Sequence, residues 1–237
     1  MLEIKNLSKS YYKREVIRDI SFKVKKEEFV TILGRSGCGK TTLLKIIAGL
    51  IDFTAGEVKI KEENKIGFVF QEPNLLPWFS SFENIALPLE IKKYSKEEIN
   101  ERVNWAISLV GLQSFKDYLP EHLSGGMKQR VSLARALVTD SDLLLMDEPF
   151  GLLDEITREE LNLELTNIWL KCKKTIVFIT HSIHEAINLS EKVIILSGNP
   201  TRIFSVIDIS LLFPRDPFDP LYLEKEIEIK KLFFLQD

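Results

Sequence analysis

A glycine-rich segment that ends in a lysine and a threonine is the clearest chemical feature of the sequence. Residues 34–41, GRSGCGKT, match the spacing GxxxxGK[ST]. The glycines let the backbone curl so that its N–H groups point at phosphate oxygens, and a following helix adds its positive end. Lys40 can then reach the β- and γ-phosphates of a nucleotide, and Thr41 can offer a hydroxyl to Mg²⁺. The alternative is a glycine-rich turn without a ligand.

Two adjacent carboxylates follow a short apolar run. Residues 143–146 are all apolar, and Asp147 and Glu148 come next. Such a strand is buried, so the carboxylates emerge at the carboxyl edge of a parallel sheet, where open α/β sheets bind ligands. Asp147 is then placed to hold Mg²⁺, and Glu148 to take a proton from an attacking water. The alternative is that both residues cap the start of a helix.

Two further polar residues end strand-like runs. Gln71 follows KIGFVF, and His181 follows TIVFIT. At a strand end, Gln71 can contact Mg²⁺ or the lytic water, and His181 can hydrogen-bond a γ-phosphate. Each has a structural alternative. Gln71 is then a solvated glutamine at a strand end, and His181 a structural histidine whose hydrogen bonds are satisfied within the fold.

The elements that must position these residues alternate along the chain. Apolar runs at 29–33, 65–70, 142–147, 175–180 and 192–197 predict buried strands, and helical patterns occur at 41–49, 99–110, 125–138 and near 161–169. This alternation predicts an α/β fold with a parallel sheet. Residues 81–138 are predicted to be mostly helical and form an insertion, whereas residues 16–24 alternate like a half-exposed strand.

Composition limits the classes of protein that remain. The chain has 237 residues, of which 45% are hydrophobic and 28% charged, with a net charge of -3. These values exclude wholesale disorder, favour one domain, and weigh against a nucleic-acid binder. Two cysteines are too few for a disulfide scaffold. Neither a secretory signal nor an apolar run of about 18 residues is visible, so we expect a cytosolic protein.

A second glycine-rich segment suggests the family. Residues 123–130, LSGGMKQR, resemble the LSGGQ signature of ATP-binding cassette (ABC) ATPases. Ser124, Gly125 and Gly126 at a helix start would form another anion-binding pocket, although the chain already has a phosphate loop. In the family this second pocket closes on ATP held by the other subunit. The resemblance therefore implies a head-to-tail homodimer with composite sites.

The resemblance spans nearly the whole chain and keeps the family's order of motifs. We name these motifs the phosphate loop (residues 34–42), the Q-loop (71–78), the signature segment (123–130) and the D-loop (150–154). Tyr11 resembles the aromatic residue that stacks on adenine, but the adjacent Tyr12 is an alternative, as is an ordinary strand-edge role for Tyr11. The implied nucleotide contacts are Tyr11, Val16, Ser36, Gly37, Cys38, Gly39, Lys40, Thr41, Thr42, Ser124, Gly125, Gly126 and Asp154. The implied metal contacts are Thr41, Gln71 and Asp147, and the implied catalytic residues are Glu148, His181 and Gln71.

Two positions depart from the family pattern. Leu152 stands in the D-loop where a small residue is commoner, which puts the dimer contact in question. Arg35 replaces a small residue or proline in the phosphate loop, where function rests on backbone groups. Because Glu148 is present, the site resembles an active one.

The implied fold is α/β, a P-loop NTPase (RecA-like) core with an N-terminal antiparallel β subdomain and an inserted α-helical subdomain. We expect a single ABC ATPase domain over 1–237, with its core at 1–82 and 139–212, the helical subdomain at about 83–138, and a tail at 213–237. The tail opens with the turn-rich PRDPFDP and continues into a helix candidate at 221–234. Whether this helix packs on the core or regulates it stays open.

Three stretches point to a narrower resemblance. Residues 71–78, 154–161 and the ending (199–203 and 214–216) are similar to the ATPases of nitrate, sulfonate and taurine importers. The resemblance implies an ATP- and Mg²⁺-dependent subunit that powers uptake of a small anionic or nitrogen- or sulfur-containing solute. It implies transmembrane permease subunits as partners, a solute-binding protein indirectly, no nucleic acid, and a place on the inner face of the cell membrane. Trp78 lies where relatives meet the permease, although core packing is its alternative.

Rival functions remain at this point. One is a non-transport ABC ATPase of DNA repair or translation, although the chain has neither a long coiled-coil or zinc-hook insertion nor a second cassette. Another is a P-loop kinase or GTPase, which the missing NKxD and the unexplained signature segment disfavour. A third is an exporter-type cassette. Only the resemblance of the Q-loop and of the C-terminal stretches to importer ATPases, which is less specific than the main motifs, distinguishes this chain from it.

Overall fold

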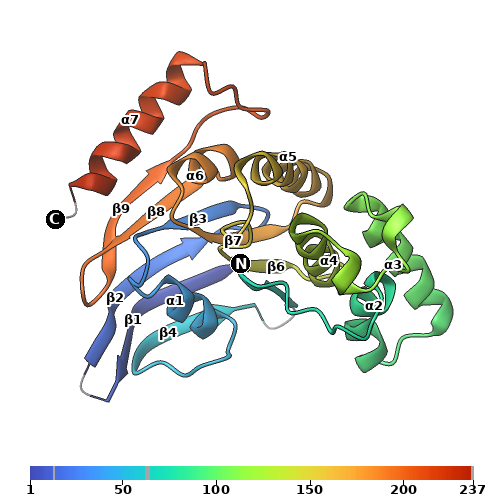
Figure 1. Ribbon diagram of the computed structural model, residues 1–237. Coiled ribbons are helices and arrows are strands. Elements are labelled where there is room, and N and C mark those ends of the chain that lie inside the picture. The colour runs from blue at the N-terminus through green and yellow to red at the C-terminus, as the bar shows by residue number, and fades with distance from the viewer. Residues whose placement is uncertain (13, 62–64, 236–237) are drawn as a thin grey trace. The chain divides into compact units, whose positions relative to one another are not determined.

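The computed structural model describes residues 1–12, 14–61 and 65–235 of the chain. The chain forms two compact units, one made of Met1–Asn64 with Lys174–Asp237 and the other of Lys65–Lys173 (Figure 1). We call them the first unit and the second unit.

The first unit is built around a sheet in which strand β3 lies between two parallel neighbours. Its strands follow the order β7-β3-β8-β9, with β3 at Phe29–Leu33, β7 at Thr175–Thr180, β8 at Lys192–Ser197 and β9 at Arg202–Asp208. Every residue of β3 and β7 is buried, which explains their nearly continuous apolar sequences. The first three strands are confirmed with the predicted bounds, and β9 pairs antiparallel to β8 at the edge.

A three-stranded antiparallel sheet completes the strands of the first unit. It has the order β2-β1-β4, with β1 at Leu2–Tyr11, β2 at Arg14–Val24 and β4 at Ala55–Ile60. Buried Ile20, Phe22 and Val24 alternate with exposed neighbours on β2, as the predicted half-exposed strand requires. The pairing of β1 with β2 is interrupted by register shifts, so its sequence lacks this regular alternation.

Three helices of the first unit bear on the site. They are α1 (Lys40–Ile47), α6 (Ile183–Leu189) and α7 (Pro220–Phe234). Gly49, at φ 70°, follows α1 and ends it close to the predicted position. Asp219 begins α7, since its carboxylate accepts a hydrogen bond of 2.8 Å from the backbone N–H of Leu221. The helix predicted at 221–234 is thus confirmed, and it packs on α6 (Figure 1).

The second unit combines a parallel strand pair with helices. Strand β5 (Ile66–Val69) pairs with β6 (Leu143–Asp147). The helices are α2 (Ser81–Ile91), α3 (Lys96–Leu109), α4 (Gly125–Leu137) and α5 (Glu155–Cys172), with 3-10 turns at Gln113–Phe115 and Pro120–His122. Ser80 and Ser95 start α2 and α3 with capping boxes. The predicted helical span at 81–138 is confirmed, since no strand interrupts these residues.

Among residues 1–12, 14–61 and 65–235, no helix is both long enough and apolar enough to cross a bilayer.

Candidate functional site

The phosphate loop connects β3 to α1 in the first unit. Gly37 and Gly39 have φ angles of 77° and 97°, a backbone region that side chains disfavour. A Cβ on Gly34 would lie 2.8 Å from the Cys38 sulfur. The glycines therefore permit a tight curl at the helix start, as an anion-binding loop requires.

Lys40 lies inside this curl and is only 4% exposed. Its ammonium donates hydrogen bonds to the carbonyl oxygens of Gly34 and Arg35, at 2.8 and 3.0 Å. The charge is thus held at the centre of the loop, where nucleotide phosphates can replace the carbonyl acceptors. Thr41 is exposed at the first turn of α1, so its hydroxyl is accessible to a metal.

His181 leaves the sheet at the same edge as the phosphate loop. Strands β3 and β7 are parallel neighbours, and Leu33 pairs with Thr180. Gly34 and His181 are the next residues on the two strands, and the His181 side chain is exposed. The first unit therefore brings the predicted switch histidine to the predicted phosphate site.

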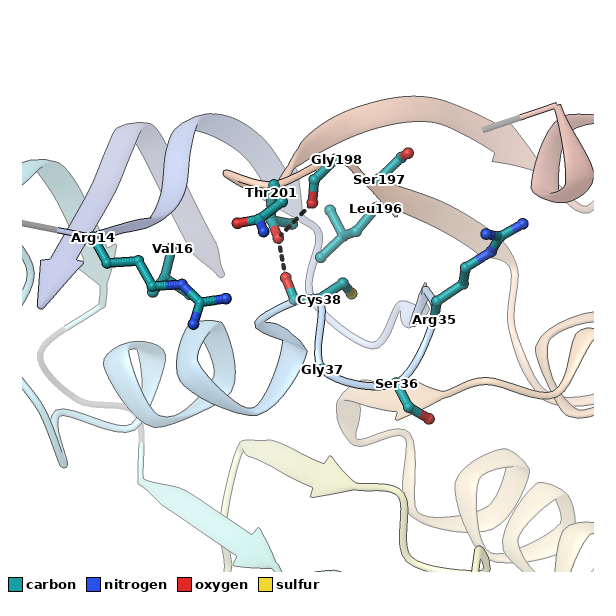
Figure 2. A pocket seen from close by; sticks show the side chains of 11 residues that line it. Arg14, Val16, Arg35, Ser36, Gly37, Cys38, Leu196, Ser197, Gly198 and Thr201 are labelled. Atoms are coloured by element: carbon teal, nitrogen blue, oxygen red, sulfur yellow. Dashed lines mark hydrogen bonds between the residues drawn. The ribbon is translucent and has the colours of Figure 1, made fainter. Parts of the chain in front are cut away.

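A cavity of about 260 Å³ lies beside the phosphate loop (Figure 2). Its lining residues are Arg14, Val16, Arg35, Ser36, Gly37, Cys38, Leu196, Ser197, Gly198, Asn199 and Thr201. Val16, which we expected at the nucleotide, is among them. The Val16 side chain also closes on the loop, because a Cβ on Gly39 would lie 3.1 Å from its Cγ1 atom.

Thr201 joins three segments around this cavity and was not anticipated from the sequence. Its hydroxyl donates to the Cys38 carbonyl (Figure 2), and its backbone N–H donates to the Val16 carbonyl at 2.9 Å. The backbone N–H of Arg18 donates to the carbonyl of Thr201, also at 2.9 Å. Thr201 thereby ties the β8–β9 connection to β2 and to the phosphate loop.

Tyr11 ends β1 and Tyr12 follows it. Tyr11 is 43% exposed, with the Lys9 ammonium 4.6 Å from the centre of its ring. Tyr12 has a φ of 52° and a side chain that is fully exposed, at 106%. Neither tyrosine lines the cavity beside the loop, so the adenine-stacking role of Tyr11 stays a prediction.

In the second unit, Gln71 and the acidic pair share a sheet edge. Strands β5 and β6 are parallel, and Val69 pairs with Met146. Asp147, the last residue of β6, is 5% exposed, and Glu148 follows it at a φ of 43°. Strand β5 ends at Val69, one residue before the predicted end at Phe70, so Gln71 lies two residues beyond the strand. The carboxylates thus sit at a carboxyl strand edge, as expected, and a left-handed backbone turns the chain at Glu148.

The signature segment begins α4. The hydroxyl of Ser124 accepts a hydrogen bond of 3.2 Å from the Met127 backbone N–H. A Cβ on Gly126 would lie 2.7 Å from the Thr157 Cγ2 atom, and a Cβ on Gly125 would lie 3.3 Å from the Leu153 Cδ2 atom. The glycines therefore let the start of α4 approach the D-loop and the first turn of α5.

Asp154 closes the D-loop and begins α5. Its carboxylate accepts a hydrogen bond of 3.0 Å from the Thr157 backbone N–H, and this bond lowers the pKa of Asp154. Leu152, the unusual D-loop residue, is 67% exposed and thus available for contact with another chain.

Two residues of α4 bond to the Q-loop or to Phe70 just before it, and neither was assigned a role from the sequence. The amide nitrogen of Gln129 donates to the Phe70 carbonyl at 3.4 Å. The Arg135 guanidinium donates to the carbonyls of Pro73 and Asn74 at 2.7 and 2.9 Å, and burial lowers its pKa. The Q-loop and the signature segment are thus linked through one helix. Trp78 is largely exposed, so its alternative of core packing is wrong.

Each unit carries oxygen atoms of the kind that Mg²⁺ prefers, namely the Thr41 hydroxyl in the first unit and the Gln71 amide and Asp147 carboxylate in the second. Among the residues that the structure describes, no cluster of three or more His, Cys, Asp or Glu side chains offers an all-protein metal site. Mg²⁺ is commonly held by few protein oxygens plus substrate phosphates.

Comparisons with known proteins agree with this geometry. The sequence profile of the ABC transporter family matches residues 17–151. The chain is 42% identical to an aliphatic sulfonates import ATP-binding protein, SsuB, of Bacillus anthracis, over 98% of this chain and 95% of that protein. It is 43% identical to the taurine import ATP-binding protein TauB of Rhizobium johnstonii, over 81% of this chain and 76% of that protein.

A solved structure shows the same fold. The dimeric structure of the ATP-binding cassette MJ0796 in a post-hydrolysis state, bound to ADP and Pi, matches with a TM-score of 0.79 and 33% identity. The match covers 90% of this chain and 100% of that one. With its α/β core and antiparallel sheet, this chain therefore belongs to the ABC transporter family of ATP-binding cassettes.

Proposed function

We propose that this chain is the ATP-binding and ATP-hydrolysing subunit of an ABC importer that takes up a small sulfonate or taurine-like solute. One observation carries the proposal: a single chain holds both a phosphate loop at the end of β3 and a serine-capped signature segment at the start of α4. The import functions named for its relatives support the solute class.

In this proposal, ATP binds with its adenine on Tyr11 and its phosphates on residues 36–42. Lys40 exchanges its carbonyl acceptors for phosphate oxygens, while Thr41, Gln71 and Asp147 would hold Mg²⁺. When bound, Mg²⁺ neutralises charge on the phosphate oxygens.

Hydrolysis requires a second copy of the chain. Ser124, Gly125 and Gly126 of one copy close on the γ-phosphate held by the other, and Asp154 lies beside them. Glu148 takes the proton of the attacking water, and His181 donates a hydrogen bond to the γ-phosphate. Most of the rate gain comes from positioning and charge stabilisation, since phosphoryl transfer needs little covalent chemistry from the protein.

The proposed domain organisation follows the cassette plan. It is a single domain over 1–237, with a helical subdomain at about 83–138 that carries the signature segment and a tail at 213–237.

The proposed partners are membrane permease subunits, with a solute-binding protein acting through them. The chain would then lie at the inner face of the cell membrane. Exposed Trp78, on the Q-loop, is available to meet a permease. Nucleic acid is not among the proposed partners.

The first experiment measures ATP hydrolysis together with size-exclusion chromatography in ATP and Mg²⁺. Glu148→Gln removes the general base, so turnover falls by about 10²–10⁴-fold and an ATP-dependent dimer accumulates. The matched control is Glu155→Gln, which changes an exposed acid in the first turn of α5 and leaves turnover unchanged. Turnover that is robust in Glu148→Gln, with no dimer under any condition, would reject the mechanism.

A second experiment separates an importer from its rivals. The chain is offered detergent-solubilised permease subunits, DNA or ribosomes, and we expect binding to the permease alone. Reconstituted vesicles then compare ATP-dependent uptake of taurine, an alkanesulfonate and nitrate. Uptake of nitrate alone would replace the proposed solute class while leaving the ATPase function intact.

A further inference from the structure

Helix α6 follows the predicted switch histidine and is unusually short. It spans Ile183–Leu189, seven residues. A helix of two turns is unstable by itself, so its position depends on what packs around it.

Hydrogen bonds tie the turn at His181 to the first turn of this helix. The Thr180 hydroxyl accepts from the Ser182 backbone N–H at 2.9 Å and donates to the Glu185 carboxylate. The Ser182 hydroxyl accepts from the Glu185 backbone N–H at 3.3 Å. The turn that carries His181 therefore follows α6 if that helix shifts or tilts.

The C-terminal helix α7 holds the first turn of α6. The Tyr222 hydroxyl lies 3.1 Å from Nδ1 of His184, and the Asn188 amide nitrogen lies 2.8 Å from Nε2 of the same ring. Burial raises the pKa of Tyr222 to about 12, so its hydroxyl stays neutral.

Arg215, just before α7, holds the other end of α6. Its guanidinium donates to the Ser190 carbonyl at 2.8 Å and also to the Ile187 carbonyl. The guanidinium lies 4.1 Å from the centre of the Phe213 ring. Burial lowers the pKa of Arg215 to about 10, so it keeps its charge at neutral pH and suits a helix C-terminus.

Apolar packing joins the same elements to the phosphate loop. One buried cluster contains Ile187 of α6, Ile229 and Phe233 of α7, and Leu33, the residue immediately before Gly34. Side chains of α7 thus share a core with the strand that carries the loop.

We propose that residues 213–234, which we call the C-terminal clasp, fix α6 and thereby set the position of His181, with Tyr222 and Arg215 as positioning residues. The proposal rests on the function proposed above. It assigns the tail a part in ATP hydrolysis that acts through α6 and His181, rather than only a share in stability.

The test uses the fact that the chain has three histidines, His122, His181 and His184. Ring-labelled protein gives one Cε1–H NMR signal for each, and a non-hydrolysable ATP analogue with Mg²⁺ should shift the His181 signal. Tyr222→Phe removes only the clasp hydroxyl. We expect the shift at His181 to be at least halved, and kcat to fall about 5- to 20-fold with KM for ATP within about twofold.

Two further variants serve as a control and as a test of the same bond. Tyr118→Phe removes an exposed tyrosine hydroxyl in the second unit and should match wild type in both measurements. His184→Ala removes the other partner of the same bond, so it should also lower kcat. The double variant His184→Ala with Tyr222→Phe should have a kcat only slightly below that of His184→Ala alone.

The outcomes are distinct. If His181 responds fully and kcat is unchanged in Tyr222→Phe, the clasp is rejected and the ATPase function stands. If kcat falls while the His181 response is unchanged, or the two variants act independently, the positioning role is also rejected. If the wild-type protein neither hydrolyses ATP nor shows a response at His181, the proposed function itself has failed.

Discussion

Helices α1 and α4 both begin at glycine-rich segments that we assign to phosphate binding, yet they begin in opposite ways. Helix α1 starts from Gly39 in a left-handed conformation, without a side-chain cap. Helix α4 starts from Ser124 in an extended conformation, and its hydroxyl caps the Met127 N–H. The first start leaves its N–H groups without a side-chain cap, whereas in the second the Ser124 hydroxyl satisfies the Met127 N–H. We propose that the first binds the phosphates held by its own chain and the second those held by another copy.

The largest expected effect tests whether these two starts act in different chains. Lys40→Ala and Ser124→Arg should each lower ATP hydrolysis by about 10²–10³-fold. Only Lys40→Ala should weaken ATP binding by the isolated chain. Mixed in equal amounts, the two inactive variants should recover about a quarter of wild-type hydrolysis, because half of the dimers keep one intact composite site.

Native mass spectrometry of the mixture checks that mixed dimers form. If they form and no activity returns, the two helix starts do not complete one another's sites. Recovery with a strong dependence on protein concentration would agree with assembly in trans.

A middle-sized effect concerns the glycines that start α4. Gly126→Ala places a Cβ 2.7 Å from the Thr157 Cγ2 atom, and this overpacking should lower the free energy of unfolding by about 1–3 kcal/mol. Thr157→Ser deletes that methyl group and should restore the loss. Urea denaturation measures both, with Gly125→Ala as a milder control whose nearest neighbour is the flexible Leu153 side chain, at 3.3 Å. If Thr157→Ser does not restore stability, the contact with Thr157 is not the reason that position 126 requires a glycine.

The smallest effect separates capping from catalysis. Ser124→Ala and Ser95→Ala each remove a cap in the second unit and should each lower the free energy of unfolding by about 1 kcal/mol. Only Ser124→Ala should also slow ATP hydrolysis. Equal hydrolysis rates in the two variants would limit Ser124 to a structural role.

Much of the fold could be predicted because its central strands are short and apolar. Strands β3, β7 and β8 match their predicted bounds, since burial on both faces leaves little choice of residue. The bounds of β1, β4 and β9 were not predicted, although the resemblance implied an N-terminal antiparallel β subdomain. Each has exposed positions, and β1 carries Asn6 at φ 48° within an irregular ladder, so no clean period marks it.

The candidate site divides in the same way. Its motif residues could be located because local glycine and acidic patterns, and the family resemblance, mark them along the chain. Contacts between distant segments leave no such mark. Thr201 bonds Cys38 across 163 positions, and Tyr222 meets His184 across 38, so only the fold reveals that Thr201 contacts the phosphate loop and that Tyr222 contacts α6.

Strand β3 lies in the interior of its sheet, with every residue buried and hydrogen-bonded neighbours on both sides. Its amide protons should be among the slowest in the first unit to exchange with solvent, because the hydrogen bonds that protect them break only when the unit unfolds. We therefore expect the phosphate loop to be attached to one of the least fluctuating segments of the first unit. Nucleotide binding should then lose little free energy in ordering the strand, which leaves more to favour the association of two copies of the chain.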